Sequence, residues 1–62
     1  MNRETLMAHK ERVEALLFAN VKEVEFIRQA DGIDLVILDT YYLSGRALAA
    51  EHMQIINQLE QI

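Results

Sequence analysis

The chain has 62 residues, of which 52% are hydrophobic and 26% charged, with a net charge of −4 and no cysteine. The six Lys and Arg residues are scattered, whereas binding to duplex nucleic acid needs a clustered basic surface. No apolar run approaches the roughly 20 residues of a membrane span, and disulfides are excluded. We expect one small domain over residues 1–62, cytoplasmic, without nucleic-acid or membrane partners.

The first segment has the spacing of an amphipathic helix. Its apolar residues recur at helical intervals between Asn2 and Ala19, at Leu6, Val13, Leu16 and Leu17. Asn2 suits the N-cap position, and Asn20 is a residue at which a helix can stop. The spacing predicts a helix from about residue 2 to residue 19.

From Val21 the pattern changes to alternation. In "VKEVEFIRQ", Val24 and Phe26 fall on one face, and Glu23 and Glu25 on the other. The turn sequence "ADG" follows, and then "IDLVILDTYY", which is rich in β-branched and aromatic residues. The alternation predicts an antiparallel β-hairpin over residues 21–42.

The register of this hairpin depends on how Asp31 and Gly32 form the turn. A type I′ turn places Phe26 opposite Ile37, whereas a type I turn with a glycine bulge shifts the pairing by one residue. The shifted register sets Glu23 against Asp39, a like-charge pair that costs stability. The first register is therefore favoured.

The last segment, after a Ser44 N-cap, predicts a second helix. Its apolar positions and one histidine follow steps of four and three, at Leu48, His52, Ile55, Leu59 and Ile62. Ala49, Met53 and Ile56 widen this stripe on one side, so the helix has more than one neighbour.

The order helix, strand, strand, helix predicts a two-layer α+β protomer of the α-β-β-α type. Its second strand is apolar on both faces, and two short helices cannot cover both. A homodimer with a shared four-stranded antiparallel sheet, and with last helix against last helix, would cover them. The expected dimer core is Leu35, Val36, Ile37, Leu38, Leu48, His52, Ile55 and Leu59.

The sequence contains few residues that could form a catalytic site or a metal site. His9 and His52 lack a second histidine or a carboxylate at i+4, and catalytic zinc usually takes three protein ligands. A pH-sensitive or metal-binding histidine pair remains the alternative to a role in helix register. Ser44 is the only serine, so nucleophilic catalysis has little to work with. We expect no enzyme, no cofactor and no metal.

Exclusion therefore leads to a non-enzymatic protein-interaction module, a homodimeric regulator, inhibitor or adaptor that docks on another protein. Aromatic and arginine side chains dominate interface energetics, which selects Phe26, Arg28, Tyr41 and Tyr42 as contact residues. The alternative is a sensor of a small anionic ligand. Its binding site would use the free N–H groups of the helix start predicted at Ser44, Gly45 and Arg46.

Overall fold

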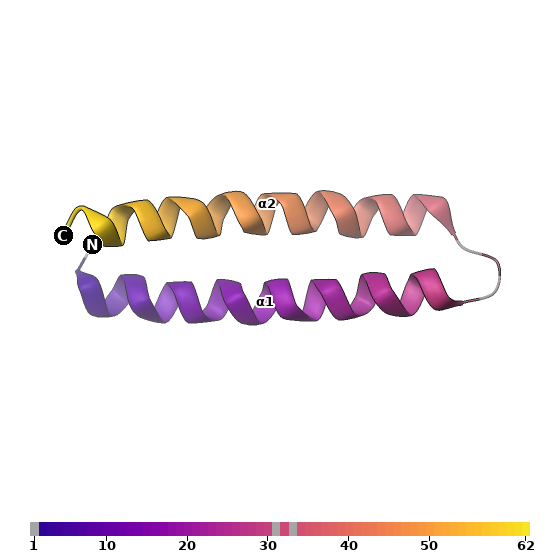
Figure 1. The fold of residues 1–62 in the computed structure, drawn as a ribbon, viewed down its shortest axis with the longest axis horizontal. Coiled ribbons are helices and arrows are strands. Elements are labelled where there is room, and N and C mark those ends of the chain that lie inside the picture. The colour runs from indigo at the N-terminus through magenta and orange to yellow at the C-terminus, as the bar shows by residue number, and fades with distance from the viewer. Residues whose placement is uncertain (1, 31, 33) are drawn as a thin grey trace.

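A computed structural model describes residues 2–30, 32 and 34–62, and it is a helical hairpin (Figure 1). Helix α1 spans Arg3–Gln29 and helix α2 spans Leu35–Glu60. The two helices run antiparallel and side by side, so that both chain ends lie at the same end of the molecule. The Cα atoms extend over 47 × 14 × 12 Å, which is an elongated shape.

The predicted α+β fold is wrong, because the described residues contain two helices and no strand. Helix α1 continues past its predicted stop at Asn20 to Gln29, and α2 begins at Leu35 instead of after Ser44. The predicted β-hairpin and its shared sheet are therefore replaced by the turn-proximal halves of two helices. Of the two predicted β-turn residues, Asp31 lies outside the described residues and Gly32 has a φ of 72°. The chain reverses direction between the end of α1 at Gln29 and the start of α2 at Leu35.

A 4-3 repeat explains why α1 does not stop at Asn20. Its residues that are shielded from solvent include a series with steps of four and three: Leu6, Lys10, Val13, Leu17, Asn20, Val24 and Ile27. This α1 seam faces α2 and runs through the segment that alternates with period two. Phe26, which the alternation placed on an apolar face, is 72% exposed. The longer repeat therefore determines the local structure.

The same rule extends α2 across the apolar run "LVIL". The α2 seam consists of Leu38, Tyr41, Gly45, Leu48, His52, Ile55 and Leu59, again with steps of three and four. An apolar run of this length does not by itself separate a strand from a buried helix. β-Branched residues cost at most about 0.7 kcal/mol each in a helix. Packing along a continuous seam outweighs that cost.

Both helices begin with a side-chain cap. The Asn2 side chain accepts a hydrogen bond from the Thr5 N–H at 2.8 Å, which confirms the predicted N-cap. The Asp34 side chain accepts from the N–H groups of Val36 and Ile37 at 3.0 and 3.2 Å. Each cap satisfies backbone donors that the first turn of a helix leaves free.

The core lies in the half of the hairpin that carries the chain ends. Its buried members are Leu6, Val13 and Ile55, and half-buried Leu17, Leu48 and Leu59 pack against them.

Of the residues described, neither helix contains an apolar stretch long enough to cross a membrane.

Nearer the turn, the helices are joined by a polar contact. Asn20 Nδ2 donates a hydrogen bond to the Tyr41 carbonyl oxygen at 3.0 Å. A Cβ on Gly45 would lie 2.7 Å from Asn20 Oδ1, so the glycine makes room for this side chain. This contact accounts for a glycine in a helix interior, where it costs about 1 kcal/mol relative to alanine.

Candidate functional site

Helix α2 carries a second apolar stripe beside the seam that packs on α1. Leu35, Tyr42, Ala49 and Ile56 recur every seven residues, and Met53 lies between the last two in the helical lattice. These five residues are named the second stripe. Leu35 is 72% exposed and Met53 66%, and Ile56 alone of the five is half-buried, so α1 leaves most of the stripe uncovered. The second stripe is the candidate functional site.

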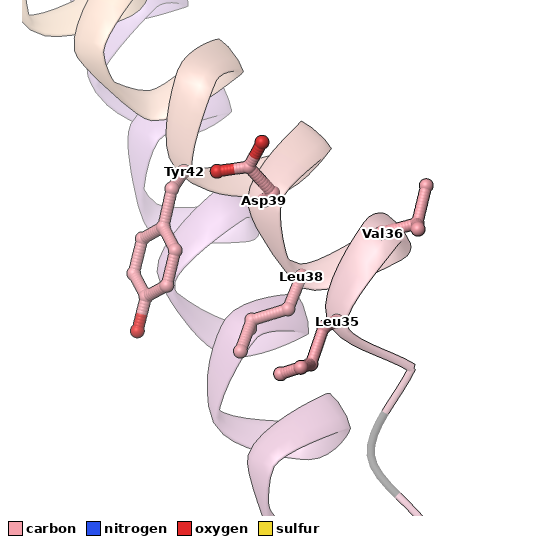
Figure 2. A pocket seen from close by; sticks show the side chains of 5 residues that line it. All are labelled: Leu35, Val36, Leu38, Asp39 and Tyr42. Atoms are coloured by element: carbon pink, nitrogen blue, oxygen red, sulfur yellow. The ribbon is translucent and has the colours of Figure 1, made fainter.

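Two shallow grooves meet at Tyr42 in this surface. One is lined by Leu35, Val36, Leu38, Asp39 and Tyr42 (Figure 2). In Figure 2 the side chains of Leu35, Leu38 and Tyr42 project to the same side of α2. The other groove is lined by Asn20, Val21, Val24, Glu25, Arg28 and Tyr42. Val21 and Arg28 of α1 therefore border the second stripe at Tyr42.

The four predicted partner-binding residues do not form one surface. Arg28 and Tyr42 do meet, since Arg28 Nη1 donates to the Tyr42 hydroxyl oxygen at 3.4 Å. Tyr41 belongs to the α2 seam and is half-buried. Phe26 is two residues from Arg28, about 200° around α1, and is exposed on another side of the hairpin. Only Arg28 and Tyr42 lie at the candidate site.

The residues predicted for the dimer core separate into two groups. Leu38, Leu48, His52, Ile55 and Leu59 face α1 of the same chain. Leu35, Val36 and Ile37 are exposed in the first turn of α2. The seam predicted to meet a second copy is therefore occupied by the protein's own first helix.

The predicted anion contact loses its structural premise. Ser44, Gly45 and Arg46 lie inside α2, which begins at Leu35, nine residues before Ser44. Backbone N–H groups inside a helix donate to carbonyl groups of the preceding turn. The segment thus has no free helix N-terminus to offer an anion.

Both histidines pair with carboxylates on the opposite helix. His9 Nε2 lies 2.9 Å from Glu51 Oε1, and His52 Nε2 lies 2.9 Å from Glu14 Oε2. Lys10 Nζ also contacts Glu14 Oε2, at 3.0 Å. The hydrogen bonds from His52 and then Lys10 hold the pKa of Glu14 below its ordinary value of 4.5. Solvent screens pairs as exposed as these, so each contributes little to the stability of the fold.

These clusters do not form a metal site within the described ranges. No group of three or more His, Cys, Asp or Glu side chains there is arranged to share a metal ion. Ser44 is exposed and lies eight residues before His52, more than two helical turns along α2. Asp39, which the shifted hairpin register would have set against Glu23, is exposed and lines the groove at Leu35.

Sequence reasoning noticed only part of the second stripe. Ala49, Met53 and Ile56 stand out beside the last heptads, and they indicate a second neighbour for that helix. The repeat continues backwards to Tyr42 and Leu35 at the same spacing of seven residues. A heptad count through residues 35–42 would have found it, but the alternating reading assigned those residues to a strand.

Comparison of the chain with protein-family models, with curated proteins and with solved structures gave no match in any of the three.

Proposed function

We propose that the protein is a non-enzymatic protein-interaction module whose second stripe binds an amphipathic helix of a partner. The observation that carries the proposal is the seven-residue repeat of apolar residues along α2, in which Leu35, Tyr42 and Ala49 are exposed and Ile56 is half-buried. A repeat of seven matches the spacing of knobs and holes between two helices, whereas a bound strand would need a period of two.

The composition of the stripe fits a binding surface. It contains an aromatic residue, Tyr42, and a flexible methionine, Met53, both of which are common in interfaces. Ala49 in the middle leaves room for a second helix to approach closely. Arg28 and Glu25 beside Tyr42 supply a polar rim.

No second function is proposed. The anion-sensor alternative depended on a helix start at Ser44, and that position lies inside α2. The polar clusters of His9 with Glu51 and of Glu14 with Lys10 and His52 lie on the outside of the hairpin, and the grooves found among the described residues are lined by other side chains.

The test is site-specific photo-crosslinking in cells that produce the protein. A photoreactive phenylalanine analogue replaces Met53 in the second stripe or, as the matched control, Leu43, which is 57% exposed on another side of α2. We expect a discrete cross-linked product from position 53 and none from position 43. Mapping of the cross-link by mass spectrometry should place it on a helix of the partner.

The absence of a product from position 53, or equal products from both positions, would contradict the proposal. The mass of the product adds a further distinction. A product of twice the 7.2 kDa chain mass identifies a second copy, and any other discrete mass identifies a different protein.

A further inference from the structure

We infer that the helix bound by the second stripe is α2 of a second copy, so that two hairpins form an antiparallel four-helix bundle. The inference rests on the proposed function for the stripe being a binding surface, and it adds the identity of the partner and the geometry of the complex.

The exposed surface of the hairpin has the size that this association requires. The protein exposes 4987 Å², whereas a compact monomer of 7.2 kDa exposes about 4100 Å². The excess is roughly 900 Å², and a standard interface buries about 800 Å² per partner. The radius of gyration is 14.4 Å, against about 11 Å for a compact domain of this length. Burial of one face of each hairpin would remove the excess.

The arrangement of the two stripes on α2 is that of a bundle helix. The α2 seam and the second stripe lie side by side on α2. The seam residues next to the stripe are Leu38, Gly45, His52 and Leu59, and these four form an edge that can contact a neighbouring helix on either side. Each of two adjacent heptad seams on one helix requires its own neighbouring helix. Helix α1 fills the first place. The second needs a helix of comparable length with a complementary heptad seam, and α2 of another copy has both properties.

An antiparallel two-fold arrangement gives the best match along this interface. With the symmetry axis at the height of Ala47 along α2, each of the four stripe residues that recur every seven positions meets a residue of the shared edge in the other copy. The layers pair Leu35 with Leu59, Leu38 with Ile56, Tyr42 with His52 and Gly45 with Ala49, one residue from each copy. The largest side chains thus lie away from the axis, and the two smallest meet near it, where they allow close approach of the helices.

A parallel arrangement fits less well. It would set identical residues of the two copies at the same height. His52 of one copy would then face His52 of the other, and the same would hold for Asp39 and for Glu60. Like charges at equal height repel, and parallel helix dipoles oppose one another. The antiparallel pair separates both carboxylates from their own copies.

Sedimentation equilibrium of the purified protein at low micromolar concentration tests the partner. We expect twice the chain mass of 7.2 kDa for the natural sequence. Ala49→Glu puts a charge at the centre of the interface and should weaken dimerisation by at least about tenfold. Ala47→Glu, the same change at an exposed alanine about 200° away on α2, should leave the dimer intact.

A monomer with the natural sequence, or equal effects of the two variants, would overturn the inference. If the monomer nevertheless gives a cross-linked product of another mass from position 53, the proposed interaction module stands and only the second copy fails.

The geometry has a separate measurement that does not depend on whether Ala49→Glu folds. Because the chain has no cysteine, Gln29→Cys allows a single spin label near the turn of each hairpin. An antiparallel pair places the two labels roughly 35 to 40 Å apart, from the helical rise of 1.5 Å per residue and the distance between helices. A distance under about 25 Å indicates parallel hairpins and would overturn the proposed arrangement.

Discussion

The half of the hairpin next to the chain ends and the half next to the turn are built differently. In the first half, Leu6, Val13 and Ile55 are 2 to 3% exposed, and two histidine–carboxylate pairs flank them. In the second half, Val36 is 78% exposed, and the helices are joined by Asn20 and by a hydrogen bond from Arg28 to Tyr42. The fully buried side chains lie in the first half, and most of the exposed large apolar side chains lie in the second. The surface available for a partner is therefore most apolar where the hairpin covers itself least.

Matched isoleucine substitutions should reveal the largest difference in stability between the two halves. Ile55→Ala removes a buried side chain and should lower the free energy of unfolding by about 2 to 5 kcal/mol, enough to unfold much of so small a protein. Ile37→Ala, at a side chain 47% exposed near the turn, should cost less than about 1 kcal/mol. Urea denaturation followed by circular dichroism, at one protein concentration, measures both. Equal losses would show that the two halves do not differ in burial.

The contact between Asn20 and Gly45 gives a smaller and more specific test. In the natural background, Gly45→Ala should bring no stabilisation, because its Cβ would displace the Asn20 side chain that donates to Tyr41. In an Asn20→Ala background, with Ala49→Glu in every protein compared so that the proposed dimer contact of Gly45 is absent, the same change should stabilise the protein by up to about 1 kcal/mol, which is the difference in helix propensity. A double-mutant cycle by urea denaturation gives the coupling. Additive effects would mean that Asn20 does not occupy the space above Gly45.

The smallest effect concerns the Glu14 cluster in the half near the chain ends. Because His52 and Lys10 lower the pKa of Glu14 in the folded protein, its ionised form stabilises the fold. This contribution is complete above the ordinary pKa of 4.5 and is lost as the pH falls through the lower, folded value. Glu14→Gln should therefore flatten the acid side of a plot of stability against pH.

The control is Glu11→Gln, which removes an exposed carboxylate from the same helix and should preserve the acid dependence of the natural protein. Thermal melts over a pH series provide the measurement. If both variants change the acid side of the plot equally, the effect is one of net charge and does not come from the contacts of Glu14.

The sequence predicted several features because they are local. Asn2 is an N-cap because its side chain reaches a donor three residues later, and the 4-3 spacing of Leu48, Ile55 and Leu59 is visible within one helix. The position of the chain reversal was also predicted, from a glycine between two apolar segments. These features need no knowledge of the rest of the molecule.

The helical structure of residues 21–29 and 35–43 could not be read so directly, because non-apolar residues interrupt both seams. Asn20 occupies a core position of α1, and Gly45 the matching position of α2, so neither continues the apolar pattern. The two residues are explained by their contact with each other, because the space beside Gly45 of α2 receives the side-chain amide of Asn20 from α1. The histidine–carboxylate pairs have the same property, because each joins residues about 40 positions apart.

The placement of both chain ends at one end of the hairpin has a practical consequence (Figure 1). Helices of 26 and 27 residues are each about 40 Å long at 1.5 Å per residue. A fluorophore, affinity handle or surface linker attached at either terminus is therefore held well away from Leu35 and the turn-proximal grooves. Immobilisation through either terminus should present the same apolar end of the molecule, so the two attachment chemistries can serve as replicates of each other.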